Sequence, residues 1–156
     1  MSNKTDFYQS LDKQLAALLT GNRNAITNLS QFSAFLNMHL EDINWAGFYL
    51  NQQDEELLLG PFQGKVACTN IPFGKGVCGT SASERATLVV EDVDQFDGHI
   101  ACDAASRSEV VCPIVVEERL IGVLDIDSPS LKRFDNEDAK GLEKLVDTLI
   151  TATDFD

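Results

Sequence analysis

The sequence has 156 residues, a length that fits one domain with a core of its own. It carries 25 acidic and 12 basic side chains, and the net charge of −13 repels phosphate backbones and anionic lipids. No stretch approaches the roughly 20 apolar residues of a membrane span, and the first residues lack the pattern of a signal peptide. We therefore expect a cytoplasmic protein with neither nucleic acid nor a membrane as a partner.

Two helices are expected at the start of the chain. The apolar residues of the first share one helical face before a stop at Gly21: Tyr8, Leu11, Leu15, Leu18 and Leu19. A second stripe of the same period predicts another helix: Ile26, Leu29, Phe32, Leu36 and Leu40. His39 falls within this second pattern, where a structural or exposed position is expected.

The next segments read as strands and loops. Residues 44–50 predict a strand, and residues 57–59, after a turn at 52–54, predict its hairpin partner. Residues 60–79 are rich in glycine and proline and predict a loop, which leads into a short helix at 81–85.

A second hairpin is predicted further along the chain. A brief strand at 88–90 comes before a long polar segment, 92–108, of the kind that is usually functional or mobile. The strands 110–116 and 120–126 are joined so tightly, through residues 117–118, that they should pair antiparallel.

The last element is predicted to be a helix. Asp135 is its expected N-cap, and its apolar face consists of Leu142, Leu145, Val146, Leu149 and Ile150. Helices at both ends of a hairpin-rich region predict an α+β domain in which helices cover an antiparallel sheet. No linker divides the chain, so residues 1–156 are expected to form a single domain.

Two aromatic side chains flank a glycine in the strand 44–50. Since strand side chains alternate, Trp45, Gly47 and Tyr49 share one face. The two rings would wall a slot above Gly47 for a small apolar group or a cation. The alternative is that both rings pack in the core and Gly47 marks a bulge.

Three carboxylates are expected near one end of the second hairpin. Asp125 and Asp127 share a strand face, and Glu109 lies at the entrance to the neighbouring strand. Such a group needs a cation, a donor or a shared proton, and it suits an ammonium or a hard metal ion. The alternative is an exposed acidic strand end in an acidic protein.

The cysteines are candidates for redox chemistry in a reducing compartment. Cys102 lies in a polar loop, which favours access, and Cys78 precedes a short helix whose N-terminus would lower the pKa of its thiol. A second thiol on a neighbouring loop is what dithiol chemistry requires. Taken singly, each cysteine is more often a buried hydrophobe. His99 could influence Cys102 or simply form a turn.

Two other kinds of site find little support. The cysteines form no CxxC pair and the two histidines are far apart, which argues against structural zinc. Residues 74–79 match the dinucleotide pattern GxGxxG, but no βαβ unit surrounds them.

Four segments together resemble the free methionine-R-sulfoxide reductases, a branch of the GAF-domain superfamily. They are NWAGFYL (44–50), GPFQGKVACTNIPFGKGVCGTSAS (60–83), GHIACDAASRSEVV (98–111) and GVLDIDSP (122–129). The resemblance runs from about residue 44 to residue 135. It implies a GAF-like fold with a central antiparallel sheet between N- and C-terminal helices.

The resemblance also implies site residues. The family's nucleophilic cysteine corresponds to Cys102, its main resolving cysteine to Cys78 and a further resolving cysteine to Cys68. The pocket residues that it implies are Trp45, Tyr49, Glu109, Asp125 and Asp127. Cys112 departs from the family pattern, and packing is its expected role.

The activity implied is the thiol-dependent reduction of free L-methionine-(R)-S-oxide to L-methionine. It would pass through a cysteine sulfenic acid and an intramolecular disulfide that thioredoxin reduces, with no bound cofactor or metal. The resemblance also implies a homodimer. The competing class is a GAF sensory module that binds a small ligand or senses oxidation without turnover.

Overall fold

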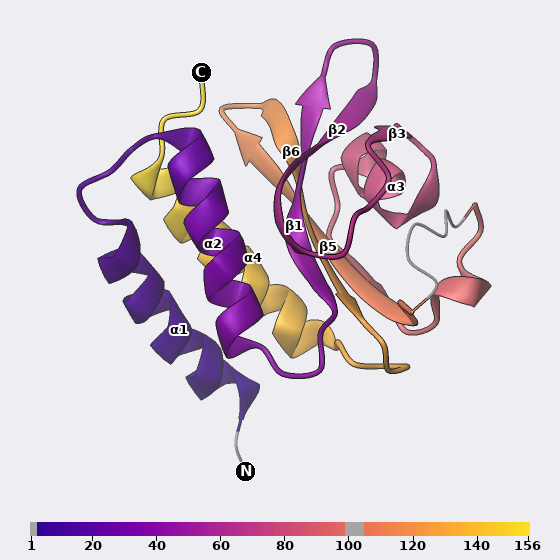
Figure 1. Ribbon diagram of the computed structural model, residues 1–156, viewed down its shortest axis with the longest axis horizontal. Helices are drawn as coiled ribbons and strands as arrows, with labels where there is room; N and C mark the ends of the chain where they lie inside the picture. The colour runs from indigo at the N-terminus through magenta and orange to yellow at the C-terminus, as the bar shows by residue number, and fades with distance from the viewer. Residues whose placement is uncertain (1–2, 99–104) are drawn as a thin grey trace.

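The computed structural model describes residues 3–98 and 105–156 (Figure 1). Helices lie at both ends of the chain and strands between them, as the sequence predicts. The elements in chain order are α1 (Lys4–Leu19), α2 (Ala25–His39), β1 (Trp45–Gln52), β2 (Glu56–Gly64), β3 (Asn70–Pro72), α3 (Gly76–Glu84), β4 (Leu88–Val90), the 3-10 turn η1 (Val93–Gln95), β5 (Ser108–Val116), β6 (Arg119–Ser128) and α4 (Asn136–Ala152).

The strands of the described residues form one six-stranded sheet in the order β3-β2-β1-β6-β5-β4. Every neighbouring pair is antiparallel, and the two predicted hairpins, β1 with β2 and β5 with β6, lie side by side through the pairing of β1 with β6. Helices α1, α2 and α4 lie on one side of the sheet and α3 on the other (Figure 1). The expected α+β architecture is confirmed.

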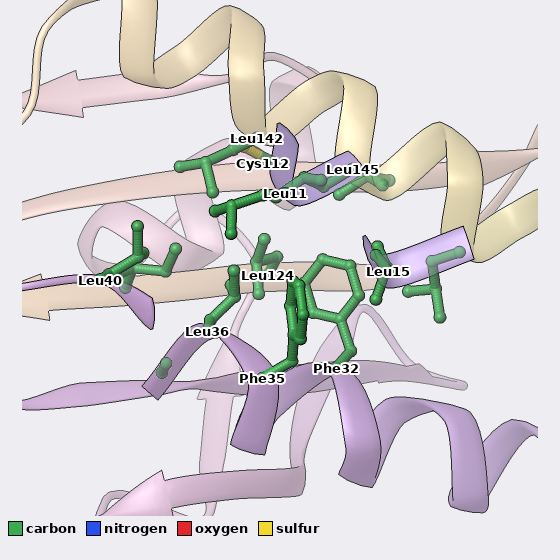
Figure 2. Packing of buried hydrophobic residues seen from close by; sticks show 14 of the residues in the cluster. Leu11, Leu15, Phe32, Phe35, Leu36, Leu40, Cys112, Leu124, Leu142 and Leu145 are labelled. Carbon is green, nitrogen blue, oxygen red and sulfur yellow. The ribbon is translucent and has the colours of Figure 1, made fainter. Parts of the chain in front are cut away.

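Strand alternation divides the core into two layers. In the central parts of β1, β5 and β6, even-numbered residues such as Phe48, Leu124 and Ile126 pack with the apolar stripes of α1, α2 and α4, as Figure 2 shows for part of this layer. Odd-numbered residues such as Val111 and Val123 pack toward α3 on the opposite face. The sheet is therefore covered on both sides, and Glu109 and Asp125, on the odd-numbered face, are buried.

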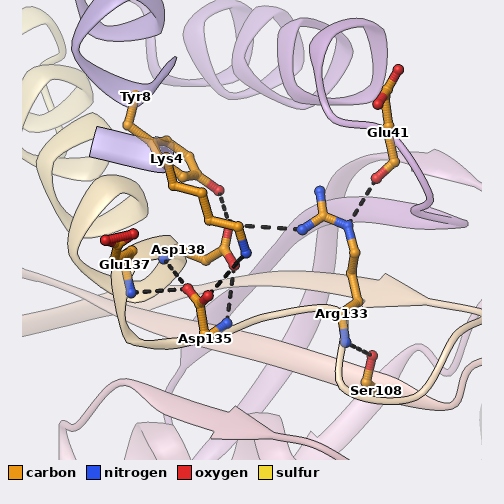
Figure 3. Close-up of polar contacts among 8 residues, drawn as sticks. All are labelled: Lys4, Tyr8, Glu41, Ser108, Arg133, Asp135, Glu137 and Asp138. Atoms are coloured by element: carbon orange, nitrogen blue, oxygen red, sulfur yellow. Dashed lines mark hydrogen bonds and ion pairs between the residues drawn. The ribbon is translucent and has the colours of Figure 1, made fainter. Parts of the chain in front are cut away.

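The helical layer is held by a close contact and a buried carboxylate. A Cβ atom at Gly141 of α4 would come within 2.1 Å of the Tyr8 ring of α1, so only glycine admits this approach. The Tyr8 phenol donates a hydrogen bond to Asp138 across 2.7 Å (Figure 3). Asp138 also forms an ion pair with Lys4, with 2.7 Å between the nitrogen and the oxygen. Asp135 caps α4 as predicted and completes a capping box with Asp138.

The region predicted as one long loop contains more structure than expected. Strand β2 continues through Pro61 to Gly64, β3 follows, and α3 begins at Gly76 rather than at residue 81. Pro61 is tolerated because it lies where the register of β1 with β2 shifts, and because β3 pairs only with residues 56–58 of β2. No helix of the described residues is both long and apolar enough to cross a membrane.

Candidate active site

Three carboxyl side chains meet on the odd-numbered face of the sheet. Glu109 of β5 lies directly opposite Asp127 of β6, and Asp125 lies opposite Val111, two residues along. The tight turn at residues 117–118 starts the pairing of β5 with β6, and a one-residue register shift between Ile114 and Val115 then brings Glu109 opposite Asp127. The grouping that the sequence suggested therefore exists, on the side of the sheet that α3 covers.

Burial keeps these acids from ionising normally. Glu109 is 8% exposed and Asp125 is 5% exposed, so the alternative of a solvated acidic strand end is wrong for both. The pKa of Glu109 is raised well above its ordinary 4.5, mainly by burial and next by the negative charge of Asp125. Burial, and then the charge of Asp127, raises the pKa of Asp125 well above 3.8. Both shifts favour the protonated form of the carboxyl, the form that can donate a proton.

Cys78 belongs to the same cluster. It lies in the first turn of α3, is buried, and its Sγ is 3.9 Å from Oε2 of Glu109. The expectation that the helix N-terminus lowers the pKa of this thiol is wrong. Burial, and then the charge of Asp125, raises the pKa well above 9.0, because both effects oppose a new negative charge. Cys78 is thus a neutral thiol beside carboxyl groups.

The other cysteines occupy different environments. Cys68 is disulfide-bonded, whereas Cys78 and Cys112 are free thiols. Cys112 is buried in the helical layer, on the opposite face of the sheet from the acids, where burial raises its pKa to about 12. This agrees with a packing role. Cys102 and His99 lie outside the described residues.

The aromatic pair is buried, but the slot predicted above Gly47 is filled. A Cβ atom at Gly47 would lie 2.2 Å from Cβ of Phe62 on β2, and the strand register shifts beside it, so Gly47 marks a bulge. Trp45 stacks on Phe62, with centroids 5.1 Å apart, and on Tyr49, with centroids 5.8 Å apart. The rings form one continuous wall rather than a gap.

Two hydrogen bonds fix this aromatic wall to the loop between β2 and β3. Trp45 donates from Nε1 to the Lys65 carbonyl at 3.1 Å, and Tyr49 donates from its phenol to the Cys68 carbonyl at 2.9 Å. Phe62, which sequence reasoning missed, completes the wall. Its signal was weak because it lies in the glycine- and proline-rich stretch that reads as a loop.

The remaining motif, GxGxxG at 74–79, serves local packing. Gly74 adopts a positive φ in the turn after β3, and a Cβ atom at Gly79 would come within 2.4 Å of the Pro72 carbonyl. The preceding strand has only three residues and pairs antiparallel, so the context of a dinucleotide site is missing.

Comparisons with known proteins agree with this fold. A GAF-domain family matches residues 29–153. The chain is 51% identical over 156 residues to the free methionine-R-sulfoxide reductase of Escherichia coli (strain K12), with 98% of this chain and 94% of that protein covered.

Two solved structures were obtained with substrate. One is fRMsr of Staphylococcus aureus in complex with substrate, with a TM-score of 0.88 and 54% identity over 93% of this chain and 94% of that chain. The other is free methionine-R-sulfoxide reductase from Neisseria meningitidis in complex with its substrate, with a TM-score of 0.92 and 41% identity over 97% of this chain and 91% of that chain.

Proposed function

The chain belongs to the free methionine-R-sulfoxide reductase family of GAF-domain proteins, and from that premise we propose that it reduces free L-methionine-(R)-S-oxide to L-methionine with its own cysteine thiols. The observation that carries the proposal is the buried group of Glu109, Asp125 and Cys78 on the sheet face that also bears the aromatic wall. A sensor would not need proton-holding acids beside a thiol.

The substrate is a small zwitterion, and the site offers partners for both of its ends. Its S-methyl group packs against Trp45 and Tyr49, and its α-ammonium is received by the carboxylate cluster. A methionine within a peptide has lost that ammonium, so it forfeits a charge-assisted contact. The proposed enzyme therefore selects the free amino acid.

The chemical step transfers one oxygen atom. The Cys102 thiolate attacks the sulfoxide sulfur, and a protonated carboxyl among Glu109, Asp125 and Asp127 donates a proton to the sulfoxide oxygen. The oxygen then passes to the Cys102 sulfur. The substrate sulfur gains two electrons and leaves as methionine, and Cys102 loses two electrons and remains as sulfenic acid. The raised pKa values of Glu109 and Asp125 support the donor role, since an acid with an ordinary pKa is ionised at neutral pH.

The sulfenic acid is then resolved by a second thiol, with loss of water. We assign this step to Cys68, with Cys78 as the alternative that the sequence placed first. Two observations support the assignment: Cys68 is already disulfide-bonded, and Cys78 has a raised pKa that disfavours its thiolate. Thioredoxin would reduce the disulfide in the cytoplasm, and the protein would act as a homodimer without a bound cofactor.

A chromatographic assay tests the proposal. Reduced protein is mixed with each sulfoxide epimer and a thiol regenerating system, and methionine is quantified over time. We expect many turnovers of the R epimer, no consumption of the S epimer, and no methionine from Cys102→Ser. Cys112→Ala, on the other face of the sheet, is the control that should keep its activity. Saturable binding without product would instead support a sensory module.

A further inference from the structure

Three side chains that differ in chemistry converge at one point of the buried site. A single ligand atom from each of Cys78, Glu109 and Asp125 lies within 4.8 Å of the other two. They come from α3, β5 and β6, and all three are buried. Because each is held by a different rigid element, their spacing is set by the fold rather than by a flexible loop.

One oxygen in this group has no hydrogen-bond partner among the described residues. Oδ1 of Asp125 is buried and accepts no hydrogen bond from the described residues, although buried carboxylate oxygens are normally satisfied. In the part of the chain that the structure describes, no lysine or arginine forms an ion pair with Glu109 or Asp125. Among residues 3–98 and 105–156, the site therefore has an open acceptor position and no basic side chain paired with it.

The donor set selects one class of cation. Thiolate ligands favour soft or borderline ions such as zinc and cadmium, while Mg²⁺ and Ca²⁺ prefer oxygen ligands alone. Around a tetrahedral zinc ion the ligand atoms are about 3.5 Å apart, given metal–sulfur and metal–oxygen bonds of about 2.3 and 2.1 Å. The three atoms lie within 4.8 Å of one another, and the Cys78 sulfur is 3.9 Å from the Glu109 oxygen, so they must draw closer to reach that arrangement.

We propose that Cys78, Glu109 and Asp125 bind one thiophilic divalent cation and that this ion inhibits the enzyme. On binding, the thiol and the carboxyls release their protons and coordinate the metal. The ion takes the acids that would receive the substrate ammonium and removes the proton that the reaction needs, so metal and substrate exclude each other. The inhibition rests on the proposed function, whereas the binding does not.

Binding is tested with cadmium in a Cys68→Ser/Cys102→Ser background, which removes the other site thiols and makes turnover irrelevant. We expect one Cd²⁺ per chain and an ultraviolet sulfur-to-cadmium charge-transfer band. Adding Cys78→Ser should abolish the band, and adding Asp125→Asn or Glu109→Gln should weaken binding at least about tenfold. Adding Cys112→Ser is the matched control and should change nothing. Circular dichroism confirms that each variant is folded.

A band that survives Cys78→Ser, an affinity unchanged by both carboxyl substitutions, or no binding at millimolar Cd²⁺ would overturn the site. The second measurement uses the unsubstituted enzyme, in which Zn²⁺ should inhibit competitively with the sulfoxide and a chelator should restore the rate. Cadmium binding together with zinc-insensitive turnover would overturn the inhibitory role. An absence of turnover under all conditions would count against the proposed function and leave the binding result standing.

Discussion

Tyr49 donates a hydrogen bond from its phenol to the backbone carbonyl of Cys68, across 2.9 Å. The bond ties the strand that carries the aromatic wall to the loop that carries the disulfide-bonded cysteine. Burial, and then the charge of Asp125, raises the pKa of this phenol above its ordinary 10.0, so it remains a donor throughout the physiological range. The substrate wall and the proposed resolving cysteine are thereby mechanically linked.

Tyr49→Phe should weaken that link without opening the core. Losing one hydrogen bond costs about 0.5–1.5 kcal/mol of unfolding free energy, and at this chain length each kcal/mol lowers the melting temperature by about 2–4 °C. We also expect slower disulfide formation after the first turnover, because Cys68 loses its anchor. Calorimetry and mass spectrometry of quenched samples measure the two effects. A variant that matches the parent in both would show that the bond has no role.

The cysteine assignments separate in single- and multiple-turnover assays. Under the proposed function, Cys68→Ser still forms one methionine per active site, but its steady-state rate with thioredoxin falls at least about tenfold, since recycling needs the disulfide. Cys78→Ser should keep more of its steady-state rate, because its thiol is buried and protonated. Comparing the burst with the steady state by chromatography provides the measurement. The reverse ranking would return the resolving role to Cys78.

The stability of the Glu109→Gln variant, relative to that of the parent protein, should increase as pH rises. The folded-state pKa of Glu109 is raised above 4.5, so its stability contribution is complete below that pH and is lost as pH rises toward the folded value. A neutral amide does not carry this penalty. The melting temperature of the variant relative to the parent should therefore be higher at about pH 8 than at about pH 4.5. A relative stability independent of pH would mean that the carboxyl ionises normally.

Gly122→Ala should disrupt the pairing of β1 with β6. A Cβ atom there would lie 2.2 Å from the Tyr49 carbonyl oxygen, a backbone atom that cannot move without shifting the strand. We expect a loss of at least about 1–3 kcal/mol in chemical unfolding, together with loss of activity, because the same strand carries Asp125. Gly21→Ala is the control: its φ of +90° is strained, but a Cβ atom there meets nothing within 4 Å. Equal effects of the two substitutions would contradict the clash.

The sequence predicted those parts of the molecule that local periodicity determines. Asp125 and Asp127 could be placed on one face because strand side chains alternate, and the two-residue turn at 117–118 predicts that β5 and β6 pair antiparallel. The register shift between Ile114 and Val115, which brings Glu109 opposite Asp127, is visible only in the structure. Glu117 and Glu118 both adopt positive φ, and Val116 pairs with Arg119 directly across the turn. The helical stripes were also readable, down to the N-cap at Asp135, but Leu18 and Ile26, which were expected on the apolar faces, are exposed.

Long-range packing decided what the sequence could not reveal. The extension of β2 through Pro61 depends on where β3 stops pairing, and the filled space above Gly47 depends on the register of a neighbouring strand. The acidity of Cys78 was misjudged for the same reason. A helix N-terminus is visible in a sequence, but burial against Glu109 and Asp125 is a property of the folded sheet.

The close approach of Tyr8 to Gly141 also bears on where this domain begins. The family match starts at residue 29, yet α1 precedes it and supplies Tyr8, Leu11, Leu15 and Leu19 to the same apolar layer as α4. Cutting the chain at residue 29 would expose the apolar face of α4 that packs against α1 and would remove Tyr8 and Lys4, two of the partners of Asp138. The folded unit thus extends beyond residues 29–153, and expression vectors should include the first helix.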